Sequence, residues 1–363
     1  MYDSTHDELG PEKILELHSP KAGFSALVVI DNTALGPSIG GVRVSTAVDK
    51  KELRRLARTM TLKNALAGLH HGGGKAAIIA NPGDPEKEVY FRIFAKQIRN
   101  LYEYIPGPDM GSNEESMAWI YDEIQRAVGL PAELGGIPLD KLGATGFGLA
   151  VCAEAAAPYA RIDLKGARVA IQGFGSVGKA AARFLSEKGA VLVAASDRGG
   201  TIFHPDGLDY KELINTKESL GTVTGHNRGT VKGLEELFMV SAEILIPAAT
   251  PDVIHRGNAD MIRAKLVLQG ANISTTREAE EIMHKRGILS IPDFIANAGG
   301  VIMASIEYAK KTEQDAFSAI TEKIKKNTEL ILDKSGREKK LPCDAASEIA
   351  KERVIRAMRY RSY

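Results

Sequence analysis

The sequence predicts a two-domain α/β protein, and three observations support this fold class. The chain has 363 residues, which is too long for one typical hydrophobic core. In its second part, short apolar runs alternate with helix-length segments, a rhythm typical of parallel sheets with crossover helices. Between one such run and the next segment lies a glycine-rich turn, at residues 173–178. The first part is also expected to mix strands and helices.

The first part of the chain shows this mixture locally. Residues 24–32 and 40–44 are rich in β-branched side chains and predict two strands. From residue 49 apolar side chains recur at helical spacing, so a helix is expected there. A third strand is predicted at 75–80. A helix is predicted over 88–105, ended by "PGPDMG".

The second part begins after a predicted loop at 134–148, which a helix follows. Residues 167–197 read as strand, glycine turn, helix and strand, which is a βαβ unit. Further strands are expected within 243–249, 265–272 and 288–297, and the tail from about residue 304 is helical and charged. A domain boundary is therefore expected near residue 140.

Composition excludes several classes of function. The formal net charge is +1 with mixed signs, so neither nucleic acid nor an anionic membrane is an expected partner. The N-terminus is polar and acidic, and no apolar run approaches membrane-spanning length. Cys152 and Cys343 have no metal-type spacing, and His70 and His71 lack further ligands nearby. We expect a cytoplasmic protein with no metal site.

The glycine turn "GFGSVG" predicts a dinucleotide site of the Rossmann type. Gly173 permits the tight turn, Gly175 lets the backbone approach a pyrophosphate, and Gly178 lets helix and strand pack closely. The helix N-terminus then faces the phosphates. The alternative is a strand-to-helix turn that needs flexible residues only.

The next strand ends in a residue that bears on the choice of cofactor. Asp197 lies nineteen residues after Gly178, where a carboxylate accepts hydrogen bonds from a ribose diol and repels a 2′-phosphate. Arg198 beside it is able to accept that phosphate. NAD is therefore the predicted cofactor, with NADP left open.

Two lysines in "LKNALAGLHHGGGKAAI" are candidates for ligand binding. Lys63 follows Met60 by three positions, so it projects from the apolar face of its helix and needs an anionic partner, such as a bound carboxylate. The alternative is that it reaches the surface. Lys75 begins a predicted strand after three glycines that would let a ligand approach. The alternative there is a solvated lysine on a flexible loop.

Asp109 in "PGPDMGS" is a candidate general acid or base. Pro106 and Pro108 fix φ on one side, and "SNEE" at 112–115 resembles a capping box that starts a helix on the other. The carboxylate would then stand on a stiff loop. The commoner use of aspartate beside proline and glycine is a turn.

Taken together, the motifs resemble a known family. "GPSIGGVRV", "MTLKNALAGLHHGGGKAAI", "PGPDMG", "ATGFG", "VAIQGFGSVG", "ILIPAA", "LQGAN" and "IPDFIANAGGV" occur in the order seen in the glutamate/leucine/phenylalanine/valine dehydrogenases, over residues 24–308. The resemblance implies reversible oxidative deamination of an L-amino acid to a 2-oxo acid and ammonia with NAD or NADP. It implies a cleft between a substrate domain, residues 1–140 completed by helices in 305–363, and a Rossmann-type domain, residues 141–304. It also implies a homo-oligomer.

The resemblance assigns roles to individual residues. Lys63 matches the lysine that binds the substrate α-carboxylate, and Lys75 matches the catalytic lysine that activates water. Asp109 resembles the aspartate that exchanges protons with the amino group. The residues expected to contact substrate are Lys63, Asn297, Ile39, Gly40, Gly107, Val301 and Ala304. The residues expected to contact the cofactor are Thr145, Gly173, Phe174, Gly175, Ser176, Val177, Gly178, Asp197, Arg198, Ala248, Asn272 and Asn297.

Two of these positions depart from the glutamate enzymes. Glutamate members hold the distal carboxylate with a lysine just before "GG" and a serine seven residues after the asparagine of "NAGGV". Here those positions are Ile39 and Ala304, and Gly107 leaves room for a bulky side chain. An anionic side chain would lose both partners, so we expect an apolar amino acid of the leucine, valine or phenylalanine type.

Two alternatives stay open. "GPDMGSN", "MAWIYDE" and "QGFGSVG" read more like glutamate enzymes, so a glutamate dehydrogenase is the alternative. A non-catalytic dinucleotide-binding regulator is the remote one. The presence of Lys63, Lys75, Asp109 and Asn297 argues against loss of catalysis.

Overall fold

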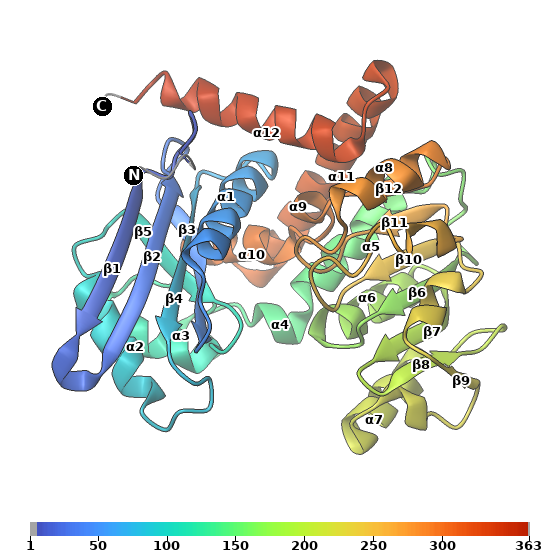
Figure 1. Cartoon of the computed structure of the whole chain (residues 1–363), viewed down its shortest axis with the longest axis horizontal. Helices are drawn as coiled ribbons and strands as arrows, with labels where there is room; N and C mark the ends of the chain where they lie inside the picture. The colour runs from blue at the N-terminus through green and yellow to red at the C-terminus, as the bar shows by residue number, and fades with distance from the viewer. Residues whose placement is uncertain (1–5, 362–363) are drawn as a thin grey trace. The chain divides into compact units, whose positions relative to one another are not determined.

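The computed structural model describes residues 6–361, which form two compact α/β units (Figure 1). The first unit contains the described residues up to Pro138, Val301–Phe317 and the described residues from Ser347 on. The second contains Leu139–Gly300 and Ser318–Ala346. The unit boundary after Pro138 lies close to the one expected near residue 140.

The C-terminal helices divide differently from the expectation that all of 305–363 completes the first domain. Residues 318–346 group with the second unit because they pack on its helix α5 (Ala144–Ala156). Thr328 Oγ1 lies 3.5 Å from the Cys152 sulfur, and the Ile324 side chain packs directly over Gly148. The helices involved are α10 (Gly299–Tyr308), α11 (Glu313–Glu338) and α12 (Pro342–Met358), and each contributes residues to both units.

Within the described residues, the first unit holds a five-stranded sheet in the order β1-β2-β4-β3-β5. The strands are β1 (Lys13–Ser19), β2 (Phe24–Asn32), β3 (Ser38–Ser45), β4 (Gly72–Ile79) and β5 (Tyr104–Pro108). β1 and β4 run antiparallel to β2, whereas β3 runs parallel to both β4 and β5. β3 therefore lies between β4 and β5, a placement that sequence order does not reveal.

The two faces of this sheet follow the two-residue alternation of strand side chains. Even-numbered residues of β2, β3 and β4 pack against helices α2 (Lys87–Gln97) and α3 (Glu114–Ile124). Odd-numbered residues of β2 and β4 pack against α1 (Lys50–Leu66) through Leu53 and Ala57. We call this second side the odd face of the sheet.

Helix α1 is held on the odd face by polar contacts as well as by its apolar side chains. Its N-cap Asp49 accepts a hydrogen bond from the Lys51 N–H, as the predicted helix start requires. The buried carboxylate of Asp31 on β2 accepts hydrogen bonds from Arg58 Nε (2.8 Å) and Thr61 Oγ1 (2.6 Å). These bonds fix α1 along the sheet, and with it Lys63 near the end of the helix.

The predicted strand and helix limits around residues 72–113 need correction. β4 begins at Gly72, so the three glycines belong to the strand rather than to a flexible loop before it. α2 ends at Gln97, and "YIPGP" forms the strand β5. Two prolines argue against a strand, but β5 pairs with β3 only, and an edge strand tolerates them. The capping box is formed by Asn113 and Ser116 rather than by Ser112 and Glu115.

Within the described chain, the second unit holds a seven-stranded sheet in the order β12-β11-β10-β6-β7-β8-β9. The strands are β6 (Arg168–Gln172), β7 (Val191–Asp197), β8 (Gly200–Phe203), β9 (Thr230–Lys232), β10 (Ile244–Pro247), β11 (Leu266–Leu268) and β12 (Leu289–Ile291). The pairs from β12 to β7 are parallel, as predicted, and β8 and β9 add an antiparallel edge. β6, α6 (Ser176–Glu187) and β7 form the predicted βαβ unit.

The segment 134–148 is less of a loop than predicted, because α4 (Leu139–Leu142) and the start of α5 occupy it. The glycines of "ATGFG" lie inside α5. A Cβ at Gly146 would lie 2.5 Å from Ala180 Cβ on α6, so this glycine permits close helix packing. In the part of the chain that the structure describes, no helix has the length and apolar character to cross a membrane.

Candidate active site

The odd face of the first sheet gathers the predicted substrate and catalytic residues. Ile39 on β3, Lys75 on β4 and Gly107 on β5 are all odd-numbered, and Asp109 follows β5 directly. The strand order places β3 between β4 and β5, so three adjacent strands contribute to one surface. α1 packs on the β2 and β4 part of the same face and carries Lys63.

Lys75 and Asp109 form a buried ion pair. Lys75 Nζ lies 3.0 Å from Asp109 Oδ2, and the side chains are 8% and 16% exposed. Burial alone would raise the pKa of the Asp109 carboxyl, but the charges of Lys75 and Arg43 hold this pKa below its ordinary value. The carboxylate is therefore ionised at neutral pH and in contact with an ammonium group.

Arg43 is a member of this site that the sequence analysis did not single out. Its Nε lies 3.1 Å from the same Asp109 Oδ2, and its Nη1 lies 2.7 Å from Glu52 Oε1. The motif "GGVRV" contained the signal, since an arginine two residues after the second glycine shares that glycine's face of the strand. A Cβ at Gly41 would lie 2.7 Å from Asp109 Cβ, so this glycine makes room for the aspartate.

The three glycines before Lys75 serve the packing of the protein itself. A Cβ at Gly72 would clash with the Asn32 carbonyl on β2, and a Cβ at Gly73 would clash with the Thr61 backbone on α1. A Cβ at Gly74 would lie 3.0 Å from Ser38 Oγ. These glycines were expected to leave room for a ligand, but the protein's own backbone lies beside Gly72 and Gly73, and the Ser38 and Tyr104 side chains lie beside Gly74.

Lys63 is buried on α1, only 5% exposed, as its spacing predicts. The next residue, Asn64, donates from Nδ2 to the Gly72 carbonyl at 2.6 Å. The lysine helix and the strand that carries Lys75 are thus bonded side by side. The alternative in which Lys63 extends to the surface is wrong.

The predicted side-chain pocket is an apolar cluster in the first unit. Ile39, Ile105, Val128 and Ala304 are buried together, and Met60 packs against them. The other predicted substrate residues are Gly40, Gly107 and the half-buried Val301. A Cβ at Gly40 would clash with the Gly74 carbonyl, and a Cβ at Gly107 would lie 3.1 Å from the Val128 side chain.

The histidine pair between the lysines has a structural position. His71 is buried, its Nδ1 lies 3.3 Å from the Pro37 carbonyl oxygen, and its ring packs edge-on to Tyr308. Burial lowers the pKa of His71. His70 is exposed. Residues 6–361 contain no group of three or more His, Cys, Asp or Glu side chains placed to hold a metal ion.

The glycine turn of the second unit has the geometry that a phosphate cradle requires. Gly173 has φ of +95°, and a Cβ at Gly178 would clash with the Gly173 carbonyl. Gly175 is the N-cap of α6, and a Cβ there would meet no atom within 4 Å. The first turn of α6, which includes Ser176 and Val177, therefore presents backbone N–H groups without intrahelical partners.

Phe174 is the exception in this turn. Its side chain is buried in the core, and its N–H donates to the Ser196 carbonyl at 2.9 Å. Neither group is available to a ligand without rearrangement. Phe174 therefore anchors the turn to β7, and its predicted contact with the cofactor stays a prediction.

Asp197 ends β7 as predicted, but its carboxylate is occupied. Oδ1 accepts hydrogen bonds from the Gly199 N–H (2.8 Å) and Thr222 Oγ1 (3.0 Å), and Oδ2 accepts from Lys217 Nζ (2.7 Å) and the Val223 N–H (2.7 Å). Burial opposes ionisation, yet these donors hold the pKa of Asp197 below its ordinary value. The neighbouring Arg198 is exposed.

The late motif "NAGGV" packs against "ATGFG" within the second unit. A Cβ at Gly299 would clash with the Ala144 carbonyl, and a Cβ at Gly300 would lie 3.2 Å from Thr145 Oγ1. Asn297 Nδ2 lies 3.1 Å from both the Gly270 carbonyl oxygen and Asn272 Oδ1. Ala248 bonds through its N–H to the Gln172 carbonyl at the end of β6. The structure thus brings these predicted cofactor residues to the carboxyl ends of parallel strands, where α/β sheets bind ligands.

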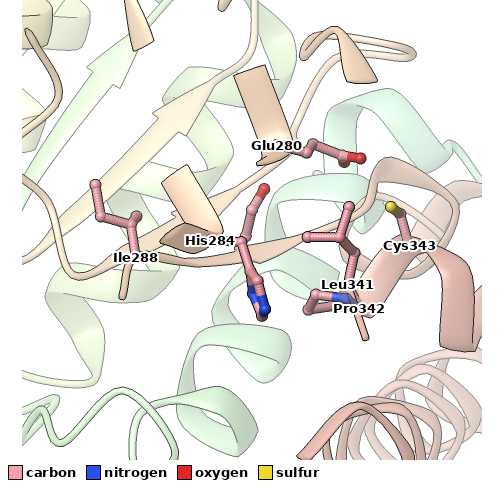
Figure 2. A pocket seen from close by; sticks show the side chains of 7 residues that line it. Glu280, His284, Ile288, Leu341, Pro342 and Cys343 are labelled. Atoms are coloured by element: carbon pink, nitrogen blue, oxygen red, sulfur yellow. The ribbon is translucent and has the colours of Figure 1, made fainter. Parts of the chain in front are cut away.

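Figure 2 shows a pocket elsewhere on the second unit, lined by Glu280, His284, Ile288, Ser290, Leu341, Pro342 and Cys343. The Glu280 carboxylate accepts a hydrogen bond from Gln269 Nε2 at 2.8 Å. Burial raises the pKa of both Glu280 and Cys343. No predicted site residue lines this pocket, so it is not part of the candidate active site.

Comparison with known sequences decides the family. A profile described as Glutamate/Leucine/Phenylalanine/Valine dehydrogenase matches residues 135–362, and one described as Glu/Leu/Phe/Val dehydrogenase, dimerisation domain, matches residues 11–126. The chain belongs to this family. It is an amino acid dehydrogenase, an enzyme that acts on CH–NH₂ donors, and the resemblance in its motifs is confirmed.

Three curated relatives are similar to this chain over most of its length. A glutamate dehydrogenase of Aeropyrum pernix is 40% identical over 357 residues, which cover 92% of this chain and 85% of that protein. An NADP-specific glutamate dehydrogenase of Saccharolobus shibatae is 37% identical, covering 91% and 83%. An NAD-specific glutamate dehydrogenase of Staphylococcus aureus is 34% identical, covering 92% and 85%.

Two solved structures share the fold over nearly the whole chain. One is a hetero-hexameric glutamate dehydrogenase from Thermus thermophilus in a leucine-bound form, with a TM-score of 0.88 and 29% identity, covering 97% of this chain and 90% of that chain. The other is an L-tryptophan dehydrogenase from Nostoc punctiforme, with a TM-score of 0.75 and 27% identity, covering 97% and 98%. The predicted fold, an N-terminal α/β domain plus a Rossmann-type domain, is confirmed.

Proposed function

We propose that this amino acid dehydrogenase catalyses the reversible, NAD(P)-dependent oxidative deamination of an L-amino acid, with Lys75 and Asp109 as its proton-transfer pair. The observation that carries the proposal is the buried contact of 3.0 Å between Lys75 Nζ and Asp109 Oδ2. A cation and an anion held together and largely shielded from water are suited to moving protons on a bound substrate.

The first unit supplies the groups for this chemistry. Lys63, buried on helix α1 that packs on this sheet, would bind the substrate α-carboxylate. Asp109 would take a proton from the substrate amino group. After Cα has lost its hydride, Lys75 would activate the water that adds to the carbon of the resulting iminium group. Proton return from the pair would then release ammonia and leave the 2-oxo acid.

The second unit fits a dinucleotide. Gly175 leaves open space before the uncapped N-terminus of α6, as a pyrophosphate requires. A bound nicotinamide would supply the acceptor for hydride from Cα. Relatives are named NAD-specific and NADP-specific, which supports use of either cofactor. The occupied carboxylate of Asp197 gives no reason to exclude NADP.

Two substrate classes are candidates, and the comparisons support glutamate better than the apolar amino acid that the sequence analysis preferred. The three relatives described above are all named glutamate dehydrogenases, at up to 40% identity. One observation favours an apolar side chain: the cluster around Ile39 and Ala304 is built of apolar residues. A glutamate carboxylate placed there would lose its water without a partner, so glutamate requires a cation from outside that cluster.

The test is a panel of L-amino acids assayed by nicotinamide absorbance with NAD and with NADP, and the reverse reaction with 2-oxo acids and ammonia. Turnover of any member supports the proposed reaction, and no turnover with any pair would refute it. A kcat/KM for glutamate far above that for leucine, phenylalanine and tryptophan would establish glutamate and reject the apolar class.

A double substitution examines the pocket itself. If Ile39 and Ala304 set specificity, Ile39→Lys with Ala304→Ser should raise kcat/KM for glutamate relative to leucine by orders of magnitude, because a buried carboxylate then gains two partners. Leu134→Ser is the control, since this side chain is half-exposed and outside the cluster. An unchanged ratio would mean that the pocket lies elsewhere.

The assembly is part of the proposal. The N-terminal match is to a dimerisation domain, and the Thermus thermophilus relative in structure is described as hetero-hexameric. Both support an oligomer for this chain. We expect it to be a homo-oligomer, which light scattering of the purified protein would measure.

A further inference from the structure

The feature that goes beyond the proposed pair is the way Asp109 is held. Asp109 Oδ2 contacts two cations, Lys75 Nζ at 3.0 Å and Arg43 Nε at 3.1 Å, and Arg43 extends to Glu52 on α1. We call these four residues the Asp109 cluster. Their charges alternate along the chain of contacts, with two positive and two negative groups.

The sheet explains why Arg43 reaches the aspartate. Arg43 lies on β3, between β4, which carries Lys75, and β5, which Asp109 follows. All three residues are odd-numbered and lie on the side of the odd face. Gly41, two residues earlier, lacks the Cβ that would press on Asp109 at 2.7 Å. The "GGVR" segment therefore provides both the space and the second cation for the carboxylate.

The two cations differ in what they can do. Lys75 must exchange protons if the proposed function holds, whereas a guanidinium stays charged at any pH that the enzyme meets. When Lys75 loses its proton, Arg43 still neutralises Asp109. Without Arg43, a buried carboxylate beside a neutral amine would favour taking up a proton.

We infer that Arg43 is a positioning residue of the reaction, which keeps the Asp109 carboxylate ionised and its Oδ2 directed at Lys75 throughout turnover. The inference rests on the proposed function, because it gives Arg43 a role through Asp109. The groups that face Asp109 are Lys75 from β4, Arg43 from β3 and the Met110 N–H. The negative charge of Asp109 also acts on Tyr104 of β5, whose pKa is raised by burial first and by this charge second. Glu52 faces Arg43 from α1.

The test is the pH profile of kcat/KM for Arg43→Gln. Removing one cation should raise the pKa of Asp109, so activity should be lost at a higher pH on acidification, by about one pH unit for one close charge. Arg43→Lys keeps a charge and should restore part of the profile. It also provides a folded variant if the glutamine variant is unstable.

Glu52→Gln is the matched control. It breaks the link from Arg43 to α1 but leaves Arg43 beside Asp109, and Glu52 is half-exposed. If Arg43 acts through Asp109, Glu52→Gln should leave the acid side of the profile in place or move it slightly lower. If Arg43 only ties α1 to the sheet, both variants should lose activity alike without any shift in the profile, and the inference is overturned.

The failure of this inference is distinguishable from failure of the proposed function. If Asp109→Asn retains full turnover, Asp109 has no role in catalysis and the proposed function loses its proton-transfer pair. The contact between Arg43 and Asp109 is then tested independently of activity. A double-mutant cycle with Arg43→Gln and Asp109→Asn compares the changes in thermal unfolding. Measurable coupling supports the pairing, and additive effects overturn it.

Discussion

Two aspartates, each at the end of a strand and each beside a lysine, show how differently the two units use the same pair of residue types. Asp109 in the first unit offers one oxygen to two cations, Lys75 and Arg43. In the second unit, both carboxylate oxygens of Asp197 accept hydrogen bonds, from four donors in all. Two of these donors are the backbone N–H groups of Gly199 and Val223. Both carboxyls have a lowered pKa, so ionisation does not separate them.

The difference lies in what the partners are bonded to. Besides the Met110 N–H, the partners of Asp109 are two long side chains from neighbouring strands, which can exchange a protein contact for a substrate contact. The partners of Asp197 include the N–H groups of Gly199, in the turn after β7, and of Val223, at the start of the short helix that follows α7 (Tyr210–Leu220). Because all four donors to the Asp197 carboxylate belong to the protein, we expect this carboxylate to stabilise the fold.

The largest expected effect is on turnover, from Asp109→Asn. The amide cannot act as a base, and it loses the charge that faces Lys75, so kcat should fall by about 10²- to 10⁴-fold. Dinucleotide affinity should persist, because the glycine turn belongs to the other unit. Steady-state kinetics and cofactor titration measure both. Asp122→Asn, an exposed surface pair with Arg92, is the control. A variant that unfolds would show that Asp109 is a turn residue.

The next effect is on stability, from Asp197→Ala. Four donors lose their acceptor, including one ammonium group, so the free energy of unfolding should fall by about 2–3 kcal/mol. Urea unfolding measures this, and saturating cofactor should leave kcat near that of the parent enzyme. The structural role of Asp197 would be contradicted by a stable variant that binds NAD more weakly but NADP as well as before. Asp197 would then bind the ribose of NAD.

A smaller effect concerns the acid side of the stability curve. The pKa of Asp197 is lower in the folded chain than in the unfolded one, so its contribution is present above the unfolded value of about 4 and is lost as pH falls through the folded pKa. Asp197→Asn should therefore lose less stability than the parent protein between about pH 5 and about pH 3. Equal slopes in both proteins would contradict the assigned shift.

The smallest effect is on cofactor choice, from Arg198→Ala. Arg198 is exposed beside a saturated aspartate, so it is the side chain most able to meet a 2′-phosphate. An exposed charged contact of this kind is worth little, and the KM for NADP should rise by about 3- to 10-fold with NAD unaffected. Arg263→Ala, exposed before β11, is the control. Equal changes for both cofactors would exclude a role in discrimination.

Several elements could be predicted from the sequence because their signals are local. β2 is expected at residues 24–32 and is found there, and α1 begins at Lys50, where a helix is expected from residue 49. The βαβ unit around Gly173 also needed only a strand, a turn and a helix in succession. Periodicity and capping act over a few residues, so one sequence is enough to reveal them.

The structural roles of the glycines were the hardest to predict from the sequence. The run at 72–74 suggested room for a ligand, and "ATGFG" suggested a loop, but both lie within regular elements that another element approaches closely. The strand β5 was missed for a related reason, because its prolines are acceptable only on an edge strand. Each of these depends on a neighbour that is distant in sequence.

The sequence by itself determined the residue types of the candidate site: two lysines, an aspartate, a glycine turn and an apolar pair at Ile39 and Ala304. Only the tertiary structure decided which of them meet. The order β4-β3-β5 brings Arg43 to Asp109, and the segment that follows α7 donates to Asp197 through Val223. The physical reason is that side-chain alternation follows from the backbone of one strand, whereas the partner of a charge follows from strand order, which pairs residues far apart in the chain.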